Sequence, residues 1–324
     1  MQIFKNPNFD FVRWRWHAIV LSLIVIGIGM ATIATRGLPL GVEFEGGTIV
    51  IVKFEQTPDI GRVRDALAAG LPGGGDAVVQ RYGSEEENQV SIRSTSVGAE
   101  QEGQISRTAE EIVKALQAAN LGSFTTVNTR IVGPIIGEQL RRQGTLATIL
   151  ALAGILVYIG LRFQFSFAVG AVVATIHDLL VTLSFLAFFN YDLTLNVIAG
   201  ILTITGYSVN DTIVVFDRVL ENMRSMRRDR LDQIVNVAVN QTLARTIITA
   251  GTTLLSVVAL FLFGGEVLRG FAFTMIVGII SGTYSTVFIA AALAIVFQGK
   301  RPLKGQAPPA SAAAPERKRR ARAS

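Results

Sequence analysis

The chain has 324 residues, of which 50% are hydrophobic and only 17% are charged, and its mean hydropathy is +0.46. This composition excludes an ordinary soluble protein and predicts an integral membrane protein. The net charge of +6 does not indicate nucleic-acid binding, because most Lys and Arg residues lie beside apolar segments. With no cysteine and two histidines, we expect no disulfide framework, no metal site and no cofactor.

Six segments are long and apolar enough to cross the hydrocarbon core of a bilayer, which is about 30 Å thick. They cover residues 16–35, 143–161, 165–189, 193–217, 241–263 and 270–297. The first segment has the alternative of a cleaved signal peptide. Because residues 1–15 are long for the basic region of such a peptide and five more spans follow, we interpret it as a retained span.

Basic residues are concentrated on one side of these spans. Residues 1–15, 218–240 and 298–324 are rich in Lys and Arg, whereas the short loops 190–192 and 264–269 carry only Arg269. We therefore expect both termini in the cytoplasm. We also expect an amphipathic cytoplasmic helical connection over 218–240 and a disordered basic tail over 298–324 that anionic membrane lipids attract.

Residues 36–142 are polar-enriched and lie between the first two spans, on the outer face in this orientation. Strand and helix patterns follow one another in the order β-α-β-β-α-β, at 48–54, 59–69, 77–82, 89–93, 102–120 and 124–132. That order is typical of ferredoxin-like domains. The predicted fold is a polytopic α-helical membrane protein with six transmembrane helices and an α+β ferredoxin-like periplasmic domain between helices 1 and 2.

Two charged residues of opposite sign lie inside apolar spans: Asp211 in the fourth and Arg245 in the fifth. A charge at the centre of a membrane span costs about 2.5–3.5 kcal/mol on insertion scales, so it needs a partner or a use. Counting from the outer end of each span at about 1.5 Å per residue places both residues about 27 Å deep. We predict that the two can pair and that they take part in charge movement across the membrane.

Polar residues accompany both charges at helical spacing. Thr203, Tyr207 and Asn210 precede Asp211 in the fourth span. The fifth span has a hydroxyl-rich face made of Thr242, Thr246, Thr249, Thr252, Thr253 and Ser256. A threonine face alone favours helix packing. Beside an aligned Asp and Arg, we interpret it as part of a hydrated proton path that includes Asn210 and Thr249.

The third span contains a second acid, Asp178, directly after His177. The pair has two open interpretations, a proton relay or a hydrogen bond to a neighbouring helix, and Asp178 is the stronger candidate for the proton pathway. Adjacent helix residues point about 100° apart, so the two cannot both face one channel squarely. Asp217 lies at the inner end of its span and is interpreted as structural. The spacing of Gly278 and Gly282 favours close helix packing.

Four motifs closely resemble the SecF family of the bacterial Sec protein-export system. They are LGVEFEGG at 40–47, VGPIIGEQL at 132–140, GYSVNDTIVVFDRVLEN at 206–222 and NQTLARTIITAGTT at 240–253. The resemblance runs from about residue 38 to 297 and keeps the six-span layout. In the first motif the family usually has Asp where this chain has Glu43, a difference that keeps the charge.

The resemblance implies a member of the resistance-nodulation-division superfamily in the bacterial cytoplasmic (inner) membrane, without enzyme activity. It implies pairing with SecD and use of the proton motive force to promote export of preproteins that leave the SecYEG channel, into which the SecA motor has pushed them. The Asp and Arg of the GYSxND and TLxRT motifs are implicated in proton passage in that family. They correspond here to Asp211 and Arg245.

Two other functions compete with this one. The chain could be half of a proton-driven small-molecule or lipid exporter of the same superfamily, but such exporters usually have two large outer domains in one twelve-span chain. It could also be a passive assembly scaffold, for which charges inside the membrane would be needless.

Overall fold

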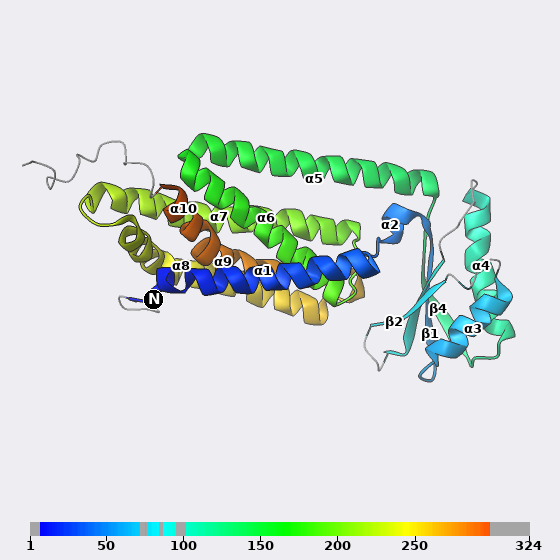
Figure 1. Cartoon of the computed structure of the whole chain (residues 1–324). Coiled ribbons are helices and arrows are strands. Elements are labelled where there is room, and N and C mark those ends of the chain that lie inside the picture. Colours follow the sequence, from blue (N-terminus) through cyan, green and yellow to red (C-terminus); the bar gives the residue numbers. More distant parts are fainter. Residues whose placement is uncertain (1–6, 72–74, 76, 84–86, 95–101, 299–324) are drawn as a thin grey trace, which may run out of the picture.

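The computed structural model describes residues 7–71, 75, 77–83, 87–94 and 102–298. Figure 1 shows an elongated bundle of long helices with a small sheet domain at one end. We call the end of the bundle beside the sheet domain the sheet end. The predicted basic tail, apart from Gln298, lies outside the described residues, as do residues 1–6.

Within the described residues, six helical segments are long and apolar enough to cross a membrane, in agreement with the six predicted spans. The first five are α1 (Phe11–Arg36), α5 (Pro134–Arg162), α6 (Phe165–Phe188), α7 (Leu195–Ser225) and α8 (Leu231–Phe263). The sixth is built from α9 (Glu266–Ser285), the π-helical turn η3 (Thr286–Ala290) and α10 (Ala291–Gln298). Within η3, the Ala290 carbonyl lies so close to α6 that a Cβ at Gly170 would be 2.8 Å from it.

Several helices extend beyond the predicted spans. Helix α5 begins at Pro134 rather than near residue 143, and the predicted connection 218–240 is not a separate helix. Its residues continue α7 to Ser225 and start α8 at Leu231, with a short break between them. Hydropathy marks only the part of a helix that fits the hydrocarbon. Arg, Glu, Gln and Met are good helix formers, so the backbone stays helical into the polar flank.

The sheet domain contains β1 (Gly47–Phe54), α3 (Ile60–Gly70), β2 (Val78–Tyr82), β3 (Gln89–Ser94), α4 (Glu102–Ala118) and β4 (Phe124–Val132). The elements follow the order expected from the sequence. The strands are antiparallel and lie in the order β2-β3-β1-β4. A short helix, α2 (Val42–Glu45), precedes the sheet and was not predicted.

The domain has its own apolar core on one face of the sheet. Val50 and Val52 of β1 are fully buried there against Val63 of α3 and Leu116 of α4. Alternate residues of a strand point to opposite faces, so Ile49 and its neighbours at the same phase face the bundle. Figure 1 shows α3 and α4 on the side of the sheet that is turned away from the long helices.

A compact joint fastens the sheet domain to the loop between α6 and α7. The Gly41 N–H donates to the Leu193 carbonyl at 2.9 Å, and the Leu193 N–H donates to the Pro39 carbonyl at 2.8 Å. Arg93 of β3 is 7% exposed. It donates to the Leu40 carbonyl at 2.6 Å and pairs with Asp192 at 3.0 Å. One guanidinium thus ties the sheet, the segment after α1 and the α6–α7 loop together.

Helices α7 and α9 pack closely through the two glycines singled out in the sequence. A Cβ at Gly278 would overlap the Ile204 side chain, and one at Gly282 would lie 3.0 Å from the Cβ of Ser208. Close approach of this kind is how small residues stabilise helix pairs in membranes. By contrast, only 6% of the apolar window of α5 and 17% of that of α8 are buried, and Figure 1 shows α5 standing apart from the other helices over most of its length.

Gly278→Ala should destabilise the purified chain by about 1–3 kcal/mol, because the new methyl group has no room against Ile204. Gly154→Ala on α5 is the matched control, because no atom lies within 4 Å of a Cβ there. It should be neutral or slightly stabilising, since Ala favours helix over Gly by about 0.5–1 kcal/mol. Thermal unfolding in detergent measures both. Equal midpoints for the two variants would contradict this account of the α7–α9 contact.

Asp192 should make the stability of the chain depend on pH. Burial raises the pKa of Asp192 above its ordinary value, the Arg93 cation lowers it, and Glu43 raises it further, with burial dominant. The folded chain therefore binds more protons than the unfolded chain between the ordinary and the raised pKa, so its stability falls as pH rises through that window. Asp192→Asn should flatten this part of the curve of unfolding midpoint against pH. A curve of unchanged slope would show that Asp192 does not titrate in this way.

Candidate functional site

Asp211 of α7 is half-buried and lies against α8. Its Oδ1 accepts a hydrogen bond of 2.8 Å from the Thr246 hydroxyl. Its Oδ2 is buried and has no hydrogen-bond partner among the described residues. A carboxylate oxygen in an apolar environment is costly without a donor. This arrangement leaves one oxygen of Asp211 open to a proton, a water molecule or a cation.

Arg245 precedes Thr246 on α8 and is exposed. It is near enough to Asp211 for an electrostatic interaction, but within the described part of the chain no ion pair joins them. Neighbouring residues on a helix point about 100° apart, so Thr246 faces α7 while Arg245 turns outward. The structure thus places Asp211 and Arg245 in the same region. The residue of α8 that contacts the Asp211 carboxylate is Thr246.

The hydroxyl-rich face of α8 is satisfied by its own helix. The Thr249 hydroxyl donates to the Arg245 carbonyl at 2.8 Å, and the hydroxyls of Thr252, Thr253 and Ser256 bond to carbonyls one turn earlier in the same way. Thr249, Thr252 and Ser256 are exposed, and so is Asn210 on α7. The exposed Asn210 amide and Arg245 cation beside these hydroxyls are unfavourable against lipid tails. This face therefore fits contact with a partner helix or with water.

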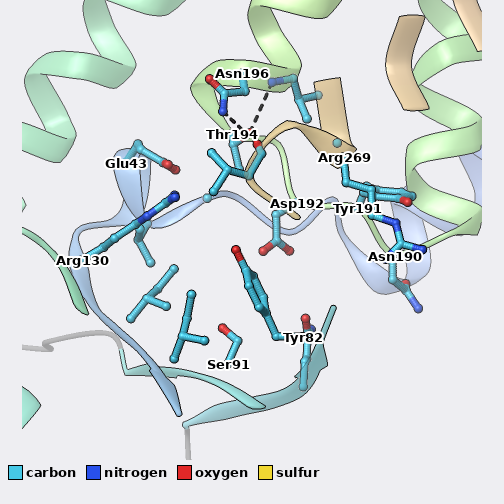
Figure 2. A pocket seen from close by; sticks show the side chains of 18 of the residues that line it. Glu43, Tyr82, Ser91, Arg130, Asn190, Tyr191, Asp192, Thr194, Asn196 and Arg269 are labelled. Atoms are coloured by element: carbon cyan, nitrogen blue, oxygen red, sulfur yellow. Dashed lines mark hydrogen bonds between the residues drawn. The ribbon is translucent and has the colours of Figure 1, made fainter. Parts of the chain in front are cut away.

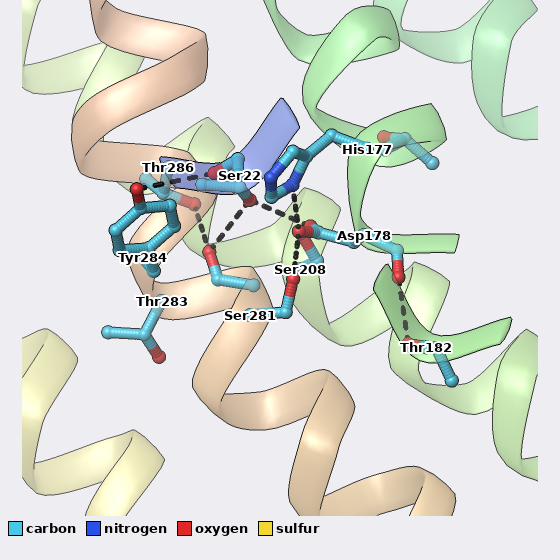
Figure 3. Close-up of polar contacts among 12 residues, drawn as sticks. Ser22, His177, Asp178, Thr182, Ser208, Ser281, Thr283, Tyr284 and Thr286 are labelled. Carbon is cyan, nitrogen blue, oxygen red and sulfur yellow. Dashed lines mark hydrogen bonds and ion pairs between the residues drawn. The ribbon is translucent and has the colours of Figure 1, made fainter. Parts of the chain in front are cut away.

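Asp178 occupies a different environment, deep between α6, α7 and α9, as Figure 3 shows. The residue is 2% exposed. Its carboxylate accepts hydrogen bonds from Ser208 at 2.5 Å, from Ser281 at 2.7 Å and from Ser285 at 2.7 Å. The His177 Nδ1 lies 3.0 Å from Oδ1. Four polar contacts fill the acceptor positions of one carboxylate.

His177 extends from Asp178 toward α1. Its Nε2 is buried without a hydrogen-bond partner among the described residues, and the ring lines an almost wholly apolar cavity of about 290 Å³ with Ser22 and Tyr284. The Tyr284 hydroxyl donates to the Ala18 carbonyl at 2.6 Å and accepts from Ser22 at 3.2 Å. The two adjacent residues point to different surroundings, as expected, and they also contact each other.

The structure does not join the two intramembrane acids into one cluster. Ser208 and Asp211 lie three residues apart on α7, but Ser208 contacts Asp178 whereas Asp211 contacts α8. Asp217 forms a half-exposed ion pair of 2.8 Å with Arg162, in keeping with a structural role. Sequence reasoning missed the serine partners of Asp178. The four-residue spacing of Ser281 and Ser285 was the available signal, since it places them on one helix face.

Comparison with known proteins gives a consistent family. The family described as "Protein export membrane protein SecD/SecF, C-terminal" matches residues 111–300, and the "SecD/SecF GG Motif" matches residues 31–58. A protein translocase subunit SecF from Rhodothermus marinus is 41% identical over 93% of this chain and 96% of its own length. One from Koribacter versatilis is 35% identical over 95% of this chain and 96% of its own length.

A solved structure agrees with these relatives. The crystal structure of SecDF from Thermus thermophilus, a translocon-associated membrane protein, is 31% identical to this chain, with a TM-score of 0.79. The match covers 91% of this chain and 39% of the SecDF chain, so this chain corresponds to less than half of that longer protein. With matched family signatures, close relatives along nearly the whole length and a similar solved structure, the chain belongs to the SecF family of protein translocase subunits.

Proposed function

We propose that this multi-pass membrane protein pairs with SecD and uses the proton motive force to promote the export of preproteins across the bacterial cytoplasmic membrane. The observation that carries the proposal is the Asp211 carboxylate, which has one oxygen bonded to Thr246 and the other buried with no partner in the part of the chain that the structure describes. A carboxylate with an unpaired oxygen inside a span is stabilised by binding a proton, because an unpaired charge is costly there. The family membership supplies the process that the proton movement would drive.

Asp211 and Arg245 together give a simple switch. When Arg245 turns toward Asp211, its charge balances the carboxylate. When Arg245 turns away, the buried Oδ2 favours taking up a proton, because a lone charge is costly at that depth. A change in the relative position of α7 and α8 then couples proton uptake to shape. One charge that crosses the whole membrane gains about 2.3 kcal/mol per 100 mV, which is the available driving energy.

The rest of the proton path is proposed to lie along the exposed polar faces of α7 and α8. Asn210 and Thr249 are exposed in this chain alone, and hydrocarbon is a poor environment for them. A second set of helices, supplied by SecD, would cover this face and enclose water against it. The low burial of α5 and α8 within the chain fits the same partner.

The proposed orientation places the sheet domain on the outer, periplasmic face and both termini in the cytoplasm, as the distribution of Lys and Arg favours. The sheet domain would then lie where preproteins emerge from SecYEG after SecA has acted on them. This placement accounts for a separate folded domain on a membrane subunit that needs no enzyme chemistry of its own.

Asp178 has a different proposed place in the mechanism. Its carboxylate already accepts from three serines and contacts His177, so it has little capacity left for a migrating proton. We assign it mainly to holding α6, α7 and α9 in register beside Asp211, as a positioning residue on the edge of the proton path.

Asp211→Asn should abolish the part of preprotein export that depends on the proton gradient while leaving assembly with SecD intact, because Asn keeps the shape but cannot ionise. Arg245→Ala should lose the same part. Export into inverted membrane vesicles, with and without an imposed gradient, measures it. Asp217→Asn is the control, since its half-exposed pair with Arg162 is worth about 0–1 kcal/mol. A normal gradient response in Asp211→Asn would contradict the switch.

Asp178→Asn should lower the thermal stability of the chain, because each hydrogen bond to a charged group contributes about 1.5–3 kcal/mol. Export per assembled complex should still respond to the gradient. The measurement pairs the unfolding midpoint with vesicle export normalised to the amount of complex. Ser281→Ala, which removes one donor, should show a smaller loss of stability. An unchanged midpoint together with a lost gradient response would instead identify Asp178 as a proton carrier.

A further inference from the structure

A cavity of about 340 Å³ lies between the sheet domain and the sheet end of the bundle. Figure 2 shows the Tyr82 ring and the Asp192 carboxylate extending toward each other from opposite walls. Tyr82 and Ser91 come from the face of the sheet that α3 and α4 do not cover, and Asp192 comes from the α6–α7 loop on the membrane side. The cavity is therefore placed where a membrane span ends and the aqueous domain begins.

Two carboxylates in this cavity each have one oxygen without a donor in the described part of the chain. Glu43 Oε2 and Asp192 Oδ1 are both buried without a hydrogen-bond partner among the described residues. The second oxygen of Asp192 pairs with Arg93 at 3.0 Å. A Cβ at Gly41 would overlap the Glu43 carboxylate and lie 2.9 Å from Thr194 Cγ2, so Glu43 reaches toward the same loop that carries Asp192. Burial raises the pKa of Asp192, as expected for an acid that lacks enough donors.

The same cavity also presents positive charge. Arg130 of β4 and Arg269 of α9 line it, and the Arg269 guanidinium makes a cation–π contact at 5.3 Å from the centre of the Phe261 ring. Arginine is well suited to phosphate oxygens. The cavity therefore has carboxylates that require a hydrogen-bond donor and arginines that can bind an anion. This combination fits a ligand that carries an ammonium group close to a phosphate.

The rim of the cavity is apolar on its membrane side. Phe189 at the end of α6 is 61% exposed and Val267 at the start of α9 is 46% exposed, and both line the cavity. These residues lie at the ends of membrane-spanning helices, where acyl chains begin. A ligand with a zwitterionic head and apolar tails would contact the whole site.

We propose that this cavity binds the headgroup of a phospholipid with a primary amine, of the phosphatidylethanolamine type. Its ammonium donates to Glu43 and Asp192, its phosphate accepts from Arg269, and its chains run over Phe189 and Val267. A lysine side chain of an exported protein would satisfy the acids but would leave the arginines and the apolar rim unused. The structure therefore favours the lipid, and the proposal holds whichever leaflet faces the sheet domain.

The test uses three phospholipids with identical acyl chains and the purified full-length chain after removal of bound lipid. Phosphatidylethanolamine has an amine that donates hydrogen bonds, phosphatidylcholine has a quaternary ammonium that cannot, and phosphatidylglycerol has no nitrogen. Native mass spectrometry should show about tenfold tighter binding of the first, as expected for hydrogen bonds to a charged group. Free phosphoethanolamine should compete only weakly, because it lacks the chains.

Variants separate the parts of the site. Glu43→Gln should remove the preference for phosphatidylethanolamine. Glu45→Gln, a change at an exposed acid of the same short helix, should keep it. Arg269→Gln should weaken all three lipids alike, and circular dichroism should confirm that each variant is folded. Equal binding of the three lipids by the unaltered chain, or an unchanged preference in Glu43→Gln, would overturn the proposal. So would exclusive capture of a preprotein by a photo-crosslinker at Tyr82.

Discussion

A charged group in a membrane span needs hydrogen-bond partners from the protein, from water or from a partner subunit, and this constraint organises the bundle. Asp178 meets it within this chain, through three serine hydroxyls of α7 and α9 and the neighbouring His177 ring of its own helix. The close contact of α7 with α9 at Gly282 brings Ser208 and Ser281 to the same carboxylate. The packing of α6, α7 and α9 therefore brings together the donors that the Asp178 carboxylate requires.

Asp211 meets the constraint only in part, and the difference separates the roles of the two acids. Among the described residues it has one donor, Thr246, and the nearby Asn210 and Thr249 are exposed. In the proposed mechanism, Asp178, with its hydrogen bonds made, stabilises the helix packing. Asp211, with one oxygen unpaired among the described residues, is the acid proposed to respond when a neighbour moves or a proton arrives.

The sequence was sufficient for the number of spans, the order of elements in the sheet domain and the identity of the two acids inside the spans. Charges stand out in apolar runs, and strands and helices have different periods, so these features carry strong local signals. Helix ends carried weaker signals, because polar residues such as those after Asp217 continue a helix as well as they form a loop. The serines around Asp178 and the cavity at Glu43 and Asp192 could not be predicted, since they depend on contacts between residues far apart in the chain.

The last span is interrupted by a π-helical turn, and this irregularity has a geometric consequence. Its π-helical turn, Thr286–Ala290, lies directly after Ser285, which bonds to Asp178. The first residue of that turn, Thr286, contacts Thr212 of α7. A π turn accommodates an extra residue, so a return to α-helical hydrogen bonding would rotate one part of the span against the other by about 100°. Such a change would turn α10, which packs against α6, relative to α9, which is hydrogen-bonded to the Asp178 carboxylate through Ser281 and Ser285.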